Sequence, residues 1–276
     1  MVKKIVPLLL FCVIGSLSSF AQTLTLGQAL NIAGKERMLS QRLAKAYLFK
    51  AYNTNTEVAQ KEIGASVILF EENLKNLLAF SPTPNVKAKF TAIESLWQSY
   101  KATVSTPEAT QEGVAFLLAN NTILLNACEE GVQELLRYSK SLPKVDNGEN
   151  EVAAEAVAQY ISSSGRVRML SQRLTLYYGA YYWNNDPRAL ETAKIVADNV
   201  QGILMNITTA EINDQATDDA ISDVIREWYV IKESCSRNNC IDFEKKNMPP
   251  VKMYDTANKV LSRIEKVVQA YAGILK

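Results

Sequence analysis

Two stretches of the chain share the same eight residues at the same spacing, and each carries an arginine suited to holding a ligand. The stretch Gly34-x-x-Arg37-Met-Leu-Ser-Gln-Arg-Leu43 recurs as Gly165-x-x-Arg168-Met-Leu-Ser-Gln-Arg-Leu174. A guanidinium group presents planar, forked donors that match a planar oxyanion. The residue types therefore indicate recognition of a small anion.

A helix turns by about 100° per residue, so each copy of the repeat places its small and polar residues on one face. If the two helices pack about a pseudo-twofold axis, Arg37 and Arg168 face each other, as equivalent residues do in an isologous interface. Two guanidinium groups repel at short range, and an anion between them reverses the sign of the interaction. The predicted ligand-binding set is Arg37, Arg168, Ser40, Ser171, Gln41, Gln172, Gly34 and Gly165.

A structural role for the same residues is the competing interpretation. Arginines on helices are commonly solvated or ion-paired, and glycine and serine often serve close packing. Arg42 and Arg173 point away from the shared face, so they are secondary candidates. We expect them to brace neighbouring helices or to pair with acids such as Glu36.

Composition excludes several classes of function. The chain has no histidine, which removes imidazole acid–base chemistry, Ser-His and Cys-His nucleophiles and histidine metal sites. No nucleophile or paired-carboxylate motif stands out, and the acidic group Asp214, Asp218 and Asp219 fits no calcium loop and reads as a solvated turn and helix start. We expect no enzyme activity, cofactor or metal. A formal net charge of +1 gives no general attraction to nucleic acid.

The first residues have the three-part pattern of a secretory signal peptide. Lys3 and Lys4 precede an apolar run, and small residues lead to a predicted cleavage after Ala21. An uncleaved membrane anchor is the alternative. Export favours a periplasmic or secreted protein, in which Cys235 and Cys240 could close a small disulfide loop, with bonded and free states equally expected, while Cys128 reads as a buried thiol.

The rest of the chain reads as nearly all helix, because long Ala-, Leu-, Glu- and Lys-rich stretches are interrupted only near good capping residues. Four helices precede a joint at Leu142–Gly148, and the pattern then repeats, with Trp97 and Trp228 at the repeat's own spacing as expected core anchors. We predict that Thr106-Pro107 opens the fourth helix and that the fifth runs from about Glu149 to Trp183. The aromatic run Tyr177–Trp183 is expected in core and interface contacts.

This pattern predicts an all-α protein of two tandem up-and-down four-helix bundles, packed as a pseudo-twofold pair or lying end to end. The expected parts are a signal peptide at 1–21, a first bundle at 22–142 and a second at 149–276.

The repeated phrase also resembles a known signature. Ala33-Gly34-x-x-Arg37 through Lys45 is similar to that of the PilJ-type domain, the N-terminal sensory domain of type IV pili methyl-accepting chemotaxis proteins, and to the periplasmic signature helix of nitrate and nitrite sensor kinases. In those kinases the resemblance implies a four-helix bundle that holds nitrate at a dimer interface through the arginine before the signature methionine. The matching residues here are Arg37 and Arg168. The second copy departs at Ser164 and Thr175, which replace alanines of the first.

The expected function is that of an exported sensory protein holding an oxyanion such as nitrate or nitrite between the signature helices. Since no kinase or methyl-accepting domain follows the second copy, a membrane-bound receptor or another envelope protein is the expected partner. The alternative is a structural or protein-interaction module of the cell envelope that has no small ligand.

Overall fold

The computed structural model describes residues 24–146, 151–233 and 243–275 and confirms the all-α prediction. The predicted signal peptide and the pair Cys235 and Cys240 lie outside these residues. In the described parts, the first half contains α1 (Leu26–Ala51), α2 (Thr56–Phe80), α3 (Pro84–Val104) and α4 (Gln111–Ser139). The second contains α5 (Ala154–Asn184), α6 (Pro187–Thr208), α7 (Gln215–Glu233), the short 3-10 helix η1 (Phe243–Lys245) and α8 (Pro250–Ile274).

Side-chain caps lie at the starts of α1, α3 and α6. Thr25 forms a capping box with Gln28 at the start of α1, and the Thr83 hydroxyl accepts from the backbone of Val86 ahead of Pro84. Asp186 caps α6 in the same way, with Pro187 at its first position. These contacts satisfy backbone donors that the helix cannot pair internally.

The predicted starts of α4 and α5 are wrong. Helix α4 begins at Gln111 with Thr110 as its cap, because the preceding segment is held against α1: Lys50 donates to the Pro107 carbonyl (2.6 Å) and Thr110 donates to the Tyr47 hydroxyl (3.1 Å). Helix α5 begins at Ala154, since the chain first pairs β1 (Val145–Asp146) with β2 (Glu151–Val152) in an antiparallel register.

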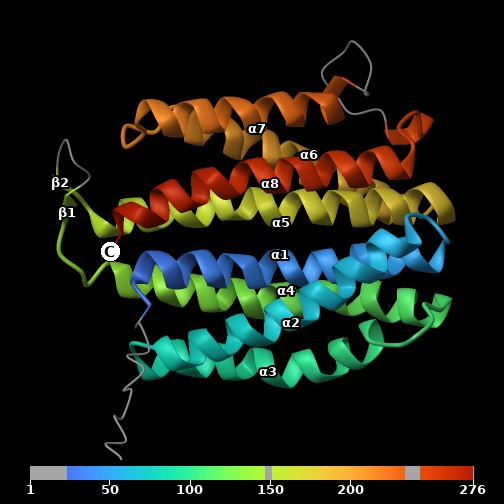
Figure 1. Ribbon diagram of the computed structural model, residues 1–276, viewed down its shortest axis with the longest axis horizontal. Helices are drawn as coiled ribbons and strands as arrows, with labels where there is room; N and C mark the ends of the chain where they lie inside the picture. The colour runs from blue at the N-terminus through green and yellow to red at the C-terminus, as the bar shows by residue number, and fades with distance from the viewer. Residues whose placement is uncertain (1–23, 147–150, 234–242, 276) are drawn as a thin grey trace, which may run out of the picture.

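Helices α1 and α5 lie side by side in the middle of the molecule (Figure 1). Helices α2 and α4 cover α1, and α3 packs mainly on α4; α6 and α8 cover α5, and α7 packs mainly on α8. Contacts of α1 with α8 and of α4 with α5 also join the halves. The two helices that carry the repeated phrase therefore form the centre of the interface between the halves.

The central position of α1 explains why nearly all of its side chains are buried, including charged ones. Trp97 and Trp228 are each 2% exposed, which confirms their prediction as core anchors. Trp97 stacks on Phe70, with ring centroids 4.0 Å apart, and the Trp228 indole donates to Gln201 at 3.1 Å. Cys128 is a buried free thiol, also as predicted.

The aromatic run of α5 joins the two halves at one end. Trp183 stacks on Tyr52 and meets Phe49 edge to face, and both partners belong to the first half, while Tyr178 is buried in the second. Core and interface contacts are thus confirmed for these residues.

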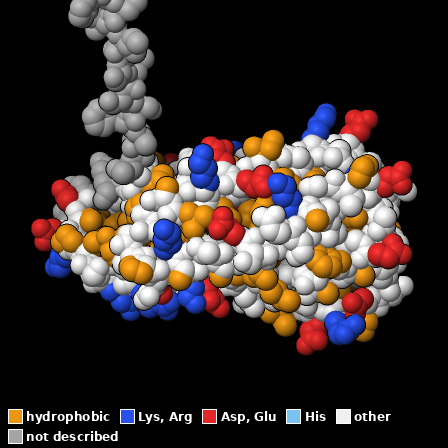
Figure 2. Space-filling view, turned by 90° about the horizontal axis from the view of Figure 1, so that it is seen from below, with side chains coloured by type: hydrophobic (Ala, Val, Ile, Leu, Met, Phe, Trp, Pro, Cys, Tyr) orange, Lys and Arg blue, Asp and Glu red, His pale blue; other side chains and the backbone are white. Residues whose placement is uncertain are grey.

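The outer surface is mixed in character. Acidic and basic side chains are spread over the face bearing α2 and α3, with apolar side chains between them (Figure 2). Among the described residues, no helix is both long and apolar enough to cross a membrane.

Candidate functional site

The Arg37 side chain, from α1, is completely buried and reaches across the interface to α5. Its Nη1 donates to Glu129 Oε2 on α4 at 2.7 Å, and its Nη2 donates to the backbone carbonyl of Ser162 on α5 at 3.1 Å. One guanidinium group thus ties three helices together.

Arg168 repeats this arrangement from the opposite side. It is also completely buried, and its Nη1 donates to Glu265 Oε2 on α8 (2.6 Å) and to the side chain of Asn31 on α1 (2.8 Å). Its Nη2 donates to the Asn31 backbone carbonyl at 3.2 Å. Asn31 and Ser162 are separated by the repeat's own spacing, so the contacts of the two arginines are related by pseudo-twofold symmetry.

The two glycines of the repeat let the arginines meet. A Cβ atom at Gly34 would lie 2.9 Å from Arg168 Nη2 and 3.5 Å from Arg37 Nη2, and one at Gly165 would lie 3.1 and 3.5 Å from the same two atoms. Both guanidinium groups therefore lie against both glycines. Arg37 and Arg168 face each other across the interface between α1 and α5, as the sequence predicts. A side chain at either glycine would overlap with the guanidinium groups.

Carboxylates neutralise part of this charge. Glu129 also pairs with Arg166 of α5 (2.7 Å), and Glu265 also pairs with Lys35 of α1 (2.9 Å). With Arg37 and Arg168, four cations share two carboxylates, which leaves two positive charges in the cluster. The predicted repulsion is thus relieved in part by the protein itself.

Burial and pairing act in opposite directions on the pKa values of the cluster. Burial lowers the pKa of both arginines, Glu129 and Glu265 counteract this, and Arg37 further lowers the pKa of Arg168. Burial on its own would raise the pKa of Glu129, but Arg37, Gln133 and Arg166 together lower it to about 2. Both carboxylates are therefore ionised at neutral pH, and each arginine has a charged partner.

Both arginines keep one unsatisfied donor. The Nε atoms of Arg37 and Arg168 are buried and have no hydrogen-bond partner within the described part of the chain. Because a buried donor without a partner costs free energy, an oxygen acceptor at this position would be stabilising.

The serine and glutamine residues of the predicted set have other partners. The Ser40 and Ser171 hydroxyls donate to the carbonyls of Arg37 and Arg168 on their own helices. Gln41 and Gln172 donate to these serines and to backbone carbonyls of α4 and α8. In the structure these four residues hold α1 and α5 to their outer neighbours, and a ligand contact by them stays a prediction.

Arg42 and Arg173 brace helices, although their partners differ from the predicted Glu36. Arg42 Nε lies 3.0 Å from Glu62 Oε1 on α2, whereas Arg173 donates to Gln41, Asn121 and Thr122 across the interface. Glu36 instead accepts from Asn73 on α2 (3.1 Å), and burial raises its pKa well above the usual range. Burial thus disfavours the charged form of this carboxyl, and in the structure Arg42 pairs with Glu62 instead.

Sequence reasoning missed the carboxylates of the cluster, although a signal for them exists. Glu129 and Gln133 form a Glu-x-x-x-Gln pattern that recurs at Glu265 and Gln269, and in both copies the glutamine donates to the glutamate. The second pattern lies five residues beyond the repeat's spacing, because the segment between α7 and α8 is longer than that between α3 and α4. This shift conceals the equivalence.

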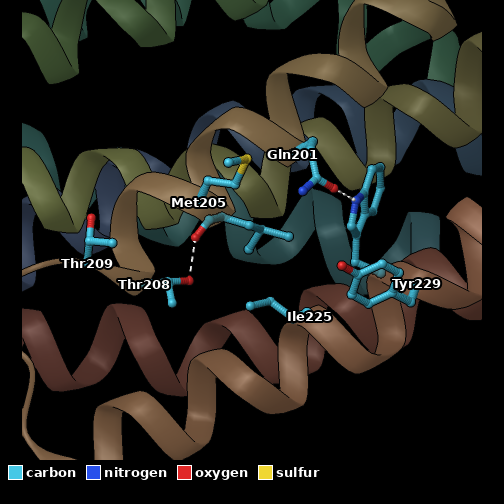
Figure 3. A pocket seen from close by; sticks show the side chains of 8 residues that line it. Gln201, Met205, Thr208, Thr209, Ile225 and Tyr229 are labelled. Carbon is cyan, nitrogen blue, oxygen red and sulfur yellow. Dashed lines mark hydrogen bonds between the residues drawn. The ribbon is translucent and has the colours of Figure 1, made fainter. Parts of the chain in front are cut away.

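A pocket also lies between α6 and α7, lined by residues within 201–229. Figure 3 shows Met205, Thr208 and Ile225 around it. Gln201, which also lines it, accepts from the Trp228 indole at 3.1 Å. None of its lining residues is charged, so it could not neutralise an anion. The acidic residues near the start of α7 form the predicted turn and helix start. The Asp214 side chain accepts from the backbone N–H of Thr217, and the Asp218 side chain accepts from the side-chain amide of Asn213.

Comparison with known protein families gives a match over part of the chain. Residues 19–120 match the model of the family described as the N-terminal part of the type IV pili methyl-accepting chemotaxis transducer, PilJ. The chain contains a PilJ-type domain. Among curated proteins and among solved structures, the chain has no match.

The PilJ-type match covers α1, α2, α3 and the beginning of α4, and it includes the first repeated phrase with Arg37. The family is one of sensory modules in signal transduction and not of catalysts. The second phrase, with Arg168, lies outside the matched residues. That α5–α8 form a second PilJ-type copy stays a prediction, to which the pseudo-twofold geometry adds support.

Proposed function

We propose that this protein is a sensory binding protein that holds a small oxyanion, of the nitrate or nitrite type, between α1 and α5. The single observation that carries the proposal is the meeting of two buried guanidinium groups, Arg37 and Arg168, in a cluster with two excess positive charges. An anion would offset that excess in a buried region, where charge interactions are strong.

The unpartnered Nε donors support the same proposal. An oxyanion has several acceptor oxygens, so one ion could bond to both arginines, as a carboxylate bonds to a forked guanidinium. Because the guanidinium groups lie against Gly34 and Gly165, the ligand enters by loosening one of the contacts made by Arg37 or Arg168.

The pairing of the arginines with Glu129 and Glu265 gives ligand binding a structural consequence. An anion competes with these carboxylates for the guanidinium donors, and the carboxylates belong to α4 and α8. Binding would therefore change how α4 and α8 are held to the central helices. A ligand shifts a conformational equilibrium only through such differential contacts.

Location and partners follow from the same proposal. The PilJ-type match and the signal-peptide pattern favour a periplasmic or secreted protein, and a membrane-bound receptor or another envelope protein would receive the signal. The proposed location rests on the family description and on the pattern of the chain's first residues. The test is to fuse these first residues to a reporter protein and to measure whether the fusion is exported and cleaved.

A second candidate function also has a specific observation in its favour. Each arginine already has a carboxylate, a backbone carbonyl and a neighbouring side chain as partners, which suffices for a purely structural role. On this alternative the protein is a helical interaction module of the cell envelope without a small ligand.

Thermal unfolding with sodium nitrate, nitrite, sulfate and acetate, at ionic strength held constant with chloride, tests the proposal. We expect nitrate or nitrite to raise the unfolding temperature, since a ligand at 100 times its Kd adds about 2.7 kcal/mol of stability. The double variant Arg37→Gln, Glu129→Gln removes one of the two facing guanidinium groups and leaves the net charge of the cluster unchanged. It should lose the shift, because the ligand then lacks one of its two guanidinium partners.

The matched control removes an ion pair far from the interface. Lys89 and Glu130 form an exposed pair between α3 and α4 (2.8 Å), and the variant Lys89→Gln, Glu130→Gln should keep the full shift. If none of the oxyanions stabilises the natural protein more than chloride does, the structural alternative is favoured.

A further inference from the structure

A pocket of about 350 Å³ lies where α1, α2 and α8 meet, at the edge of the interface between the halves. Its polar lining includes Lys35 and Arg42 from α1 and Asn258 and Glu265 from α8. Its apolar lining is Met38, Leu69 and Leu261. The pocket thus combines two cations with an aliphatic wall, and the side chains of both cations are about a quarter exposed, at 27% and 26%.

A buried polar cluster holds Arg42 at the wall of this pocket. Glu62 of α2, 5% exposed, contacts Arg42 Nε at 3.0 Å and Lys45 Nζ at 2.6 Å, and it accepts from the Tyr254 hydroxyl at 2.8 Å. Lys45 also donates to Gln172 and Asn258. Burial lowers the pKa of Lys45 to about 8, so the lysine keeps its charge at neutral pH.

The pseudo-twofold symmetry breaks at this cluster. The positions equivalent to Lys45, Glu62, Tyr254 and Asn258 in the other half carry uncharged residues that do not form such a cluster: Leu176, Ala193, Leu118 and Thr122. There the arginine equivalent to Arg42, Arg173, turns inward and donates its Nη1 and Nη2 to Gln41, Asn121 and Thr122. On the pocket side, Lys45 takes the corresponding bond to Gln172.

Because of this asymmetry, Arg42 has hydrogen-bond donors at the pocket that no protein group accepts from in the described part of the chain. Arg42 contacts Glu62 through Nε alone, and in the described part of the chain its Nη1 and Nη2 make no hydrogen bond. Counting the residues around the pocket, Lys35, Arg42, Lys45 and Arg168 supply four positive charges against the three of Glu62, Asp255 and Glu265, which leaves one positive charge in excess. The region therefore attracts an anion through an arginine fork that protein groups do not occupy.

We propose that this pocket is a second binding site, for a small organic carboxylate with a short aliphatic chain. The carboxylate would bind the Nη donors of Arg42 with Lys35 nearby, and the chain would contact Met38, Leu69 and Leu261. A three-oxygen inorganic ion fills a small part of 350 Å³ and leaves the aliphatic wall without a partner, whereas a carboxylic acid of four to six carbons uses both parts of the lining.

This site is separate in position from the oxyanion site between Arg37 and Arg168, and the two sites share the charges of Lys35, Arg168 and Glu265. The probes separate the two proposals: pentanoate reports on the pocket, and nitrate reports on the paired arginines. Failure of either one leaves the other standing.

Titration of the full chain with pentanoate, followed by NMR of methionine methyl groups, tests the site. Met38 lines the pocket, and Met169 is its equivalent in the other half, so one spectrum holds both the probe and its control. We expect the Met38 signal to shift in a saturable way and the Met169 signal to stay in place. Pentan-1-ol, which lacks the charge, should bind at least about tenfold more weakly, as expected for loss of a charged hydrogen bond.

Two pairs of variants complete the test. Ser262→Trp fills the pocket from an exposed position of α8 and should abolish the Met38 shift, while Asn126→Trp at the equivalent exposed position of α4 should leave it. Lys35→Gln should weaken pentanoate binding several-fold, and Arg166→Gln should not. The proposal is overturned if pentanoate causes no saturable Met38 shift, if pentan-1-ol binds as tightly, or if Ser262→Trp and Asn126→Trp behave alike.

Discussion

The paired arginines illustrate how a buried charge is held in this protein. Arg37 and Arg168 are both 0% exposed, and the desolvation of a charge at such a position is costly unless the charge is paired and hydrogen-bonded. Each receives a carboxylate from its own half and a backbone carbonyl from the other half. The carboxylate stabilises the charge, and the carbonyl fixes the position of one half against the other.

Acid stability gives a test at this scale. The pKa of Glu129 in the folded protein is about 2, below its ordinary value of 4.5, so the folded state binds fewer protons than the unfolded state between these values. The contribution of Glu129 to the free energy of unfolding is therefore fully present above pH 4.5 and is lost as the pH falls toward 2. We expect Glu129→Gln to lose on the order of 2 kcal/mol at pH 7 and to show a flatter decline in acid.

Urea unfolding at several pH values between 7 and the acid range measures both effects. The control is Glu130→Gln on the same helix, because the Glu130 side chain is exposed and pairs only with the exposed Lys89 among the described residues. Equal losses for the two variants would contradict a special role for Glu129.

At the scale of helices, α1 and α5 differ from the other α-helices that the structure describes in being buried on nearly all sides. Because of this burial, the face of the repeated phrase, with its small and polar residues, is not exposed to solvent. The N-terminal end of α1 also makes a close contact. At its N-terminal end, Gly27 donates its backbone N–H to the carbonyl of Leu275 at 3.0 Å, just after α8 ends.

A pair of glycine substitutions tests this docking. A Cβ atom at Gly27 would lie 2.3 Å from the backbone oxygen of Ala272 and 2.5 Å from that of Leu275, and neither backbone atom can move without displacing the end of α8. We expect Gly27→Ala to lower the free energy of unfolding by about 1–3 kcal/mol. Thermal or urea unfolding measures the change.

The matched variant is Gly64→Ala in α2, where a Cβ atom would meet nothing within 4 Å. It should raise stability by about 0.5–1 kcal/mol, because alanine loses less backbone entropy than glycine in a helix. Destabilisation by both variants to the same extent would argue against a specific contact at Gly27.

For the whole molecule, the pseudo-twofold relation makes the halves depend on each other. Each half contributes one central helix, and the carbonyls of Asn31 and Ser162 that accept from the arginines come from the opposite half. A half on its own would expose the inner face of its central helix, including a buried arginine.

A chain of residues 22–142 tests this dependence. We expect it to form a homodimer in which a second α1 takes the place of α5, since the two helices share the repeated phrase and an isologous interface uses the same surface twice. Light scattering after size-exclusion chromatography measures the mass. A monomer that unfolds as cooperatively as the full chain would contradict this prediction.

Local signals in the sequence were enough for most of the secondary structure. The capping box at Thr25 and the cap–proline pair at Asp186 are local patterns that favour a helix start, and the structure begins α1 and α6 directly after them. The pair Thr106-Pro107 carries the same local signal, but the contacts of Lys50 and Tyr47 from α1 move the start of α4 to Gln111. Such contacts join residues far apart in the chain, and no local pattern contains them.

By itself, the sequence determined the all-helical class, the repeat and the identity of the two arginines that meet at its centre, because helix periodicity and duplication are written in residue spacing. Only the tertiary structure decided which carboxylates neutralise those arginines and that Arg42 and Arg173 have different partners. Glu129, Glu265 and Glu62 reach their cations from other helices, and the difference between Lys45 and Leu176 matters only where the two halves pack together. Charge pairing between distant residues depends on packing, which residue spacing alone does not encode.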